Sequence, residues 1–182
     1  MLRLYIERHD PETPKRSGAC LHFAPEDHIG SLFRDTPGLA YFGSEYEFYQ
    51  AAMRCPKGRG FVADLQRLGV QSDSVDITVC VHVLEHVRVD RASIAEMHRI
   101  LKPGGVAYIM VPFDMTLEAT EEWDEPDPDI YGHIWAYSRF DFKDRLAAFE
   151  VEEIKPDSFL SQEEQVRFGV PEKEIIYRCV KR

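Results

Sequence analysis

The residues best suited to chemistry are two histidines and a glutamate in the middle of the chain. They are His82, Glu85 and His86, in the string HVLEH. On a helix, spacings of three and four residues bring these side chains to one face, where they can bind a divalent metal ion. The string also satisfies H-x-x-E-H, the signature of one class of zinc peptidases, which needs the motif inside a helix and a third ligand further along the chain. His86 can alternatively act as a general base, because an imidazole titrates near neutral pH.

The elements on either side of this string decide where it lies. The run from Val75 to Val81 is almost entirely β-branched or apolar, which predicts a strand buried on both faces of a parallel sheet. From Asp90, a predicted N-cap, apolar residues recur with a period near 3.6 and predict a helix that ends in LKPGG. A second apolar run, Val106 to Val111, follows at once. Strand, helix and strand form a right-handed βαβ unit, and the ligands of such sheets bind beyond the carboxyl ends of the strands, where HVLEH stands.

HVLEHV after a buried strand, followed by a helix that ends in LKPGG, resembles one branch of the class I S-adenosylmethionine-dependent methyltransferases. The resemblance extends over most of the chain. It implies an α/β, Rossmann-like fold with a mostly parallel sheet, and S-adenosylmethionine as the methyl donor. We expect transfer to an oxygen or nitrogen atom of a small molecule, in an in-line displacement that depends mainly on holding the reacting atoms collinear.

The resemblance also implies which residues contact the donor. The family normally has a glycine-rich loop after the first strand, because the backbone approaches the ligand closely there. LHFAPE stands in its place here, and resembles a sub-branch with this hexapeptide. Glu45 matches a carboxylate that accepts the ribose hydroxyls, and Asp64 matches the acidic residue near the adenine amino group. In the interpretation that we favour, Glu85 and His86 orient the start of the helix without metal. The predicted donor contacts are Phe23, Ala24, Pro25, Glu26, Glu45, Asp64, Leu65 and His82, and the predicted catalytic residues are His86 and His82.

Residues 112–137 contain no Lys or Arg and are rich in acidic and aromatic side chains. We expect a long loop on the acceptor side, because the family usually recognises its acceptor after the fifth strand. Aromatic rings beside carboxylates can bind an amine-bearing or cationic acceptor. The alternative is a solvated acidic loop whose aromatic residues pack as a lid. The aromatic residues concerned are Trp123, Tyr131, His133, Trp135 and Tyr137.

The rest of the pattern predicts one domain over residues 1–182, with a leading helix and linker at 1–18. A capping box at Ser138 and Asp141 favours a helix from Phe140 to Ala148. Ile175 to Tyr177 is an apolar run that, on an exposed edge, can support a homodimer. The other predicted elements are strands Ala19 to Phe23, Leu39 to Gly43, Phe61 to Ala63, Phe149 to Ile154 and Ile175 to Val180, helices around Ile29 to Phe33 and Tyr46 to Arg54, and a loop from Pro56 to Gly60.

Composition limits the possible partners. A net charge of −10 and a pI near 5.2 argue against nucleic acid. No apolar run approaches the ~18 to 20 residues of a membrane span, so we expect a soluble, cytoplasmic protein with no membrane partner. The four cysteines are far apart and predict reduced thiols. The missing glycine loop leaves one alternative from another class, a catalytically silent relative that binds a partner. A further alternative is a zinc hydrolase that uses His82, Glu85 and His86.

Overall fold

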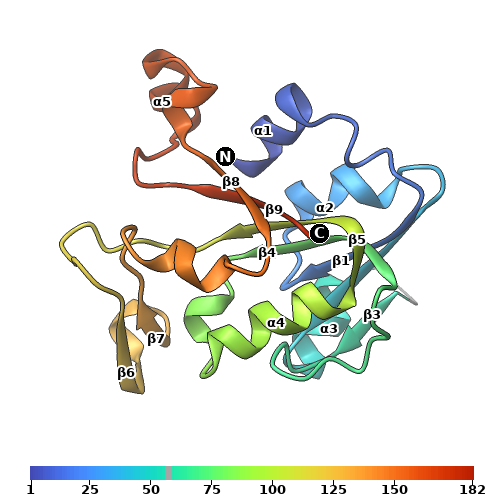
Figure 1. Cartoon of the computed structure of the whole chain (residues 1–182), viewed down its shortest axis with the longest axis horizontal. Helices are drawn as coiled ribbons and strands as arrows, with labels where there is room; N and C mark the ends of the chain where they lie inside the picture. Colours follow the sequence, from blue (N-terminus) through green and yellow to red (C-terminus); the bar gives the residue numbers. More distant parts are fainter. Residues whose placement is uncertain (56–58) are drawn as a thin grey trace.

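The computed structural model describes residues 1–55 and 59–182. Its main feature is a seven-stranded sheet with the order β3-β2-β1-β4-β5-β9-β8 (Figure 1). The strands from β3 to β5 run parallel, whereas β9 lies antiparallel between β5 and β8. This confirms the predicted α/β architecture with an antiparallel C-terminal hairpin. In chain order the elements are α1 (Leu2–His9), β1 (Gly18–Phe23), α2 (Asp27–Arg34), β2 (Leu39–Glu45), α3 (Phe48–Arg54), β3 (Gly60–Val62), β4 (Val75–Val81), a 3₁₀ helix (Leu84–His86), α4 (Asp90–Ile100), β5 (Leu101–Met110), β6 (Glu121–Asp127), a 3₁₀ helix (Pro128–Ile130), β7 (His133–Ala136), 3₁₀ helices (Phe142–Leu146 and Pro156–Ser158) with β8 (Glu150–Ile154) between them, α5 (Gln162–Phe168) and β9 (Ile176–Val180).

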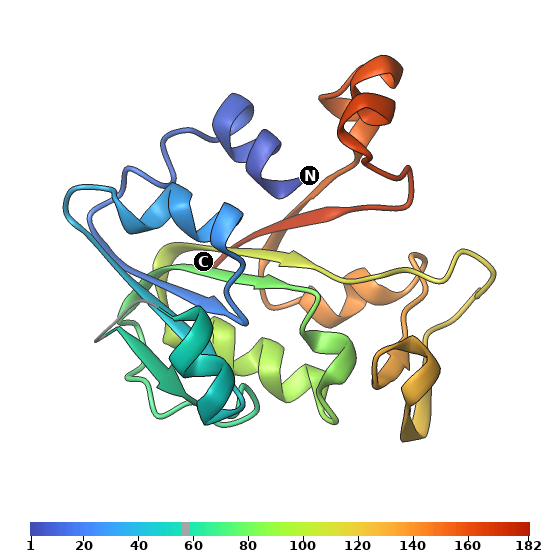
Figure 2. The same ribbon diagram turned by 180° about the vertical axis from the view of Figure 1, so that it is seen from behind.

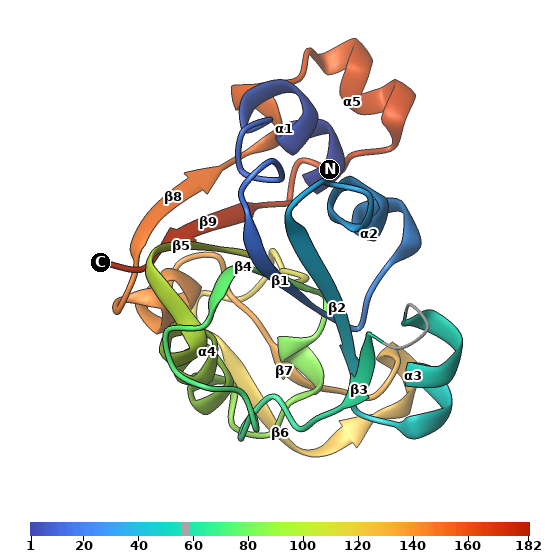
Figure 3. The same ribbon diagram turned by 90° about the vertical axis from the view of Figure 1, so that its right-hand side faces the viewer.

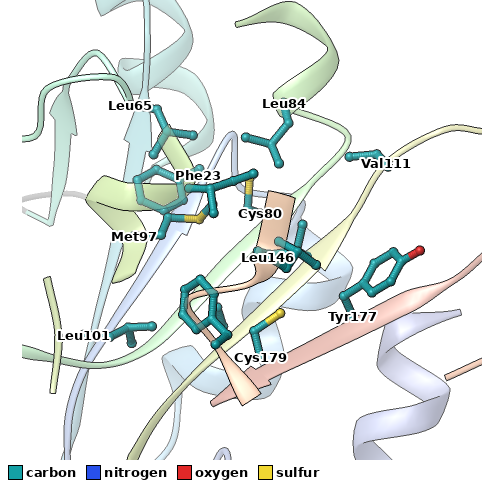
Figure 4. Packing of buried hydrophobic residues seen from close by; sticks show 14 of the residues in the cluster. Phe23, Leu65, Cys80, Leu84, Met97, Leu101, Val111, Leu146, Tyr177 and Cys179 are labelled. Atoms are coloured by element: carbon teal, nitrogen blue, oxygen red, sulfur yellow. The ribbon is translucent and has the colours of Figure 1, made fainter. Parts of the chain in front are cut away.

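The sheet has a hydrophobic core on each face. Along β4, Ile77 and Val79 pack on the side of α1 and α2, and Cys80 packs on the side of α4. Figure 3 shows α1 and α2 on one side of the sheet and α4 on the other. The α4 core is drawn in Figure 4, where Met97 of the helix lies beside Phe23 and Cys80 of the sheet. Burial on both faces explains why the sequence of a strand such as β4 is an almost continuous apolar run.

Residues 112–137 are not the long loop that the sequence predicts. β6 and β7 pair in an antiparallel hairpin outside the main sheet. In Figure 2 the hairpin stands beside the main sheet, near the segment that follows β4. The acidic composition of β6 concealed a strand, because its side chains are mostly exposed and form no apolar pattern.

Three predictions around α4 and the following segments are wrong. Asp90 is the first residue of α4 and not its N-cap, because its buried carboxylate accepts a hydrogen bond from Arg145 Nε at 2.7 Å. The helix predicted from Phe140 to Ala148 is only the short 3₁₀ helix Phe142–Leu146. Its proposed capping residue, Asp141, accepts hydrogen bonds from the backbone and side chain of Thr120 instead.

The C-terminal part of the chain differs from the prediction in two further ways. Ile175 to Tyr177 does not form an exposed edge, because β9 lies inside the sheet and all three residues are buried. The predicted dimer edge is therefore wrong. Helix α5 was not predicted, although Ser161 and Glu164 form the capping box that starts it. The predicted loop from Pro56 to Gly60 falls mostly outside the described residues. No helix in the described ranges is both long and apolar enough to cross a bilayer.

Candidate functional site

A cavity of about 480 Å³ opens at the carboxyl ends of β1, β2 and β4. We call it the strand-end cavity. Parallel strands end at the same edge of the sheet, so residues far apart in sequence meet there. Its floor comes from the strand ends and its wall from the segment after β4. The lining residues are Phe23, Ala24, Ser44, Glu45, Tyr46, Arg54, Ala63, Asp64, Leu65, Gln66, His82, Val83, His86, Val87, Arg88 and Ile134.

The chain turns sharply where β1 and β4 end. Ala24 and His82 have φ angles of +46° and +52°, a backbone conformation that residues other than glycine rarely adopt. Each keeps one more backbone hydrogen bond with the neighbouring strand: Ala24 N–H donates to Ser44 O at 2.8 Å, and His82 N–H to Met110 O at 3.0 Å. Strain of about 1–3 kcal/mol per residue persists only where the surrounding structure enforces it, and here it occurs twice beside one cavity.

Glu45 ends β2 with a carboxylate in the wall of the strand-end cavity. Only 9% of the residue is exposed, and Oε1 accepts a hydrogen bond from Arg54 Nη1 at 3.3 Å. Burial raises the pKa of Glu45, and the neighbouring guanidinium partly opposes this. The side chain therefore offers acceptor oxygens in a place that is already largely dehydrated.

Asp64 and Leu65 follow β3 on the opposite side of the strand-end cavity. Asp64 is exposed and Oδ1 accepts a hydrogen bond from Gln66 N–H at 2.9 Å, which fixes the turn. Leu65 is buried against Phe23 in the α4 core. Ala63 N–H donates to Glu45 O at 2.9 Å and links this turn to the end of β2. A polar acceptor and an apolar wall thus stand side by side.

The string HVLEH does not lie on an α-helix. His82 follows the end of β4, and Leu84–His86 forms a single 3₁₀ turn. Glu85 is 1% exposed, whereas His82 and His86 are exposed. His82 Nδ1 lies 3.6 Å from Glu85 Oε1, and this carboxylate raises the pKa of His82. The helix that the zinc-peptidase signature requires is therefore absent from this segment.

The hairpin β6–β7 packs against the segment after β4. Trp135 Nε1–H donates to Val87 O at 2.8 Å, and the Arg88 guanidinium donates to the carbonyls of Trp123 and Asp124 at 3.0 and 2.9 Å. These contacts bring His133 beside His86, with ring centroids 4.9 Å apart. Burial lowers the pKa of His133.

A second cavity, of about 400 Å³, lies on the other side of this histidine pair. We call it the hairpin cavity. His133 lines it and His86 lines the strand-end cavity, so the two cavities meet at the pair. Of the predicted acceptor-side aromatic residues, Tyr131 is exposed and Tyr137 is buried in the core. The lining residues are Pro112, Phe113, Asp114, Met115, Trp123, Ile130, His133, Trp135, Ala136 and Lys173.

Six of the eight predicted donor contacts line the strand-end cavity, and Pro25 and Glu26 do not. Glu26 instead lines a smaller cavity of about 230 Å³. Sequence reasoning missed Arg54 and Arg88 in the main site, and it named His133 only among the acceptor-side aromatic residues. No local signal marks Arg88, because its role depends on the hairpin contact. His133 carried a weak signal, as the one histidine in the acidic aromatic segment.

The chain is similar to known proteins in fold and, over part of its length, in sequence. A family model described as a methyltransferase domain matches residues 38–109. A search of curated proteins found no match. Among solved structures, the [4+2]-cyclase SpnF is similar with a TM-score of 0.70 and 15% identity, over 99% of this chain and 80% of that one. An S-adenosylmethionine-dependent methyltransferase from Mesorhizobium loti has a TM-score of 0.68 and 13% identity, over 94% and 96% of the two chains. A geranyl diphosphate methyltransferase in complex with S-adenosylmethionine has a TM-score of 0.67 and 11% identity, over 99% and 85%.

The fold is the one seen in S-adenosylmethionine-dependent methyltransferases, which confirms the fold expected from the resemblance of HVLEHV and LKPGG. Its central part, residues 38–109, also matches the methyltransferase-domain model by sequence.

Proposed function

We propose that this chain binds S-adenosylmethionine in the strand-end cavity and transfers its methyl group to an oxygen or nitrogen atom of a small molecule. One observation carries the proposal. Glu45 places a largely buried carboxylate at the end of β2, in a cavity formed where β1, β2 and β4 end. Ligands of open α/β sheets bind at this edge.

The residues present fit the chemistry of the donor. An adenosine group needs apolar walls and acceptors for its hydroxyl and amino groups, and the cavity offers Phe23 and Leu65 as walls and Glu45 and Asp64 as acceptors. The volume of about 480 Å³ lies within the range of roughly 300–1,000 Å³ that is usual for small-molecule sites. Ala24 keeps the sharp turn with a φ angle of +46°, so the backbone still bends away at the strand end without a glycine.

Each residue has a separate task in this proposal. Glu45 accepts hydrogen bonds from the two ribose hydroxyls, Asp64 accepts from the adenine amino group, and Phe23 and Leu65 exclude water from the base. When bound, the donor supplies a methyl group on a positively charged sulfur; the acceptor's lone pair forms the new bond to that carbon while the carbon–sulfur bond breaks and its electrons stay with the sulfur. Holding the acceptor in line provides most of the acceleration.

The acceptor's proton needs a base if its pKa is high. His82 is poorly suited because Glu85 raises its pKa, so it keeps its proton to higher pH. His86 lies in the same cavity wall and takes this role in the proposal. His82 instead offers an N–H donor to the amino-acid tail of the donor molecule.

The hairpin cavity is the proposed place of the acceptor. It adjoins the strand-end cavity at the histidine pair, and Trp123 and Trp135 supply aromatic surface. The Arg145 guanidinium already lies 5.4 Å from the Trp135 ring centroid, so Trp123 is the better partner for a cationic or amine-bearing acceptor. The net charge of −10 agrees with a small-molecule acceptor and not a nucleic acid.

A catalytically silent binding protein is the second candidate. It is favoured by the alanine at the strained turn and by the contact between Arg54 and Glu45, which occupies part of the carboxylate. The fold is also similar to that of a [4+2]-cyclase, so the fold by itself does not specify methyl transfer.

Calorimetric titration with S-adenosylmethionine and its demethylated product tests both candidates. We expect affinity in the micromolar range, weakened by Glu45→Ala and by Asp64→Ala and unchanged by the control Glu47→Ala, whose side chain is exposed. Folded protein that binds neither compound at millimolar concentration would refute the donor site. Donor binding without label transfer to any compound in a panel of phenols, alcohols and amines would instead favour the silent candidate.

A further inference from the structure

A cluster of possible metal ligands lies where the two cavities meet. Within residues 1–55 and 59–182, Glu85, His86 and His133 form the one group of three whose ligand atoms all lie within 4.8 Å of one another. This is not the set expected from the sequence, since His133 belongs to β7 and His82 is not part of the group.

Glu85 provides the second, independent observation. Its residue is 1% exposed, and Oε2 is buried without a hydrogen-bond partner in the described structure. Oε1 lies 3.6 Å from His82 Nδ1, which is too long for a normal hydrogen bond. A buried carboxylate oxygen without a hydrogen-bond partner is strongly unfavourable, and proteins usually supply a cation or a donor to it. A metal ion beside Oε2 would remove this deficit.

The two histidines are oriented by the surrounding backbone. His86 Nδ1 lies 3.4 Å from Gly132 O, so an Nδ1–H donor leaves Nε2 with a free lone pair. Metal-bound histidines usually make such a contact with their other ring nitrogen. His133 is held in place because its neighbour Trp135 donates to Val87 O at 2.8 Å. The ligands therefore come from two segments, the turn after β4 and strand β7, that are joined by this hydrogen bond.

We propose that Glu85, His86 and His133 bind one divalent transition-metal ion of the zinc type at the boundary between the strand-end and hairpin cavities. Two imidazoles and one carboxylate suit Zn²⁺ or Co²⁺, whereas Mg²⁺ and Ca²⁺ prefer oxygen ligands. Three protein ligands leave a coordination position open, as in catalytic zinc sites. Because the site borders both cavities, the metal ion can also bind an oxygen atom of the acceptor and lower the pKa of its proton, in place of the base role proposed for His86; this last step rests on the proposed methyl transfer.

Titration of metal-stripped protein with Co²⁺ tests the site through the visible absorption of the bound ion. We expect one Co²⁺ per chain, displaced by Zn²⁺ and not by Mg²⁺. His133→Ala and His86→Ala should weaken binding by more than the ~10–100-fold loss typical of mutating an outer partner. Both side chains are at least partly exposed, so the variants are expected to fold. Glu85→Gln, which keeps the shape of the side chain, should have a similar effect.

Two controls separate this site from other histidine sites. His28→Ala removes an exposed histidine on α2 and should leave the Co²⁺ spectrum unchanged. His82→Ala should change Co²⁺ affinity much less than His133→Ala. The inference is overturned if metal-stripped protein shows no Co²⁺ spectrum, or if His133→Ala binds Co²⁺ as tightly as the unmodified chain.

Donor titration of the same samples distinguishes failure of this site from failure of the proposed function. Glu45→Ala should lose donor affinity and keep the Co²⁺ spectrum, and His133→Ala should show the reverse. Donor binding without metal binding would refute only the metal site. Metal binding without donor binding would refute only the proposed donor site.

Discussion

Replacing Glu45 with glutamine should separate ligand binding from folding at one side chain. The carboxylate is 9% exposed, and its only side-chain hydrogen bond in the described structure comes from Arg54 at 3.3 Å. Glutamine keeps the shape of the side chain and one carbonyl oxygen, but it removes the charge. The donor would therefore still fit in the cavity, with weaker hydrogen bonds from its hydroxyl groups.

The expected loss of affinity follows from the kind of hydrogen bond that is removed. A hydrogen bond to a charged group contributes about 1.5–3 kcal/mol, roughly twice the contribution of a neutral one. Two ribose hydroxyls that lose the charged acceptor but keep one neutral acceptor should cost about 1.5–3 kcal/mol together, a factor of about 10 to 150 in Kd. The carboxylate is already largely buried, so little of its contribution is spent on further desolvation.

The same substitution should not reduce folding stability at neutral pH. Burial raises the pKa of Glu45 in the folded protein, so the folded state binds a proton more tightly than the unfolded state. The unmodified chain therefore loses stability as pH rises from the unfolded to the folded pKa, and the loss is complete above the folded pKa. Arg54, whose side chain is 53% exposed, offsets this by only about 0–1 kcal/mol. Glutamine lacks the penalty, so the variant should be as stable as the unmodified chain or more so.

Calorimetry with the donor and thermal unfolding between about pH 4 and 8 measure the two effects on one sample. The stability of Glu45→Gln relative to the unmodified chain should increase as pH rises through the raised pKa of Glu45. Glu47→Gln, an exposed neighbour, is the matched control. Unchanged donor affinity in Glu45→Gln would refute the role of the carboxylate, and a clear loss of stability at pH 7 would refute the argument from burial.

Three further substitutions test how the site is held. Ala24→Gly relieves the strain at a φ angle of +46° but gives the unfolded chain more conformational freedom. In urea titration its free energy of unfolding should therefore be unchanged or higher by up to about 1 kcal/mol. Ala24→Val should lower the free energy of unfolding. Arg145→Met should lower the free energy of unfolding by about 3–5 kcal/mol in the same assay, because it leaves the Asp90 carboxylate, which is 3% exposed, without its cation. Adding Asp90→Asn should restore part of this stability. No restoration in the double variant would contradict this reasoning. Ser161→Ala removes the capping box of α5 and should lower the stability of this helix by about 1 kcal/mol. The measurement is hydrogen exchange of the α5 amides, which should become faster. Unchanged exchange would show that the cap does not stabilise the helix.

The parallel part of the sheet could be predicted because its signals are local. β4 begins and ends where its apolar run does, and β1 and β2 differ from their predicted ranges by one or two residues. A strand buried on both faces is largely apolar along its length, so its limits can be predicted from the apolar run. The resemblance to the methyltransferases selected Glu45 and Asp64, and both line the strand-end cavity because parallel strands end at the same edge of the sheet.

The acceptor side could not be predicted because its structure depends on distant contacts. β6 has the sequence EEWDEPD, and its strand form comes from pairing with β7 and from the hydrogen bonds that Arg88 donates to its carbonyls. Asp90 has the usual signature of a cap, but Arg145, 55 residues later, draws its carboxylate into the interior. His133 reaches His86 only because the hairpin folds back on the segment after β4.

The absence of a glycine-rich loop is weaker evidence against a donor site than the sequence suggests. A glycine at that turn serves a positive φ angle and a close approach of the backbone. Ala24 adopts the positive φ angle at +46°, and His82 does the same at the end of the adjacent strand β4. Both residues line the strand-end cavity, although neither conformation is favourable for its side chain. The backbone geometry that a glycine would provide is therefore present at this cavity, although the chain has alanine and histidine at the two positions.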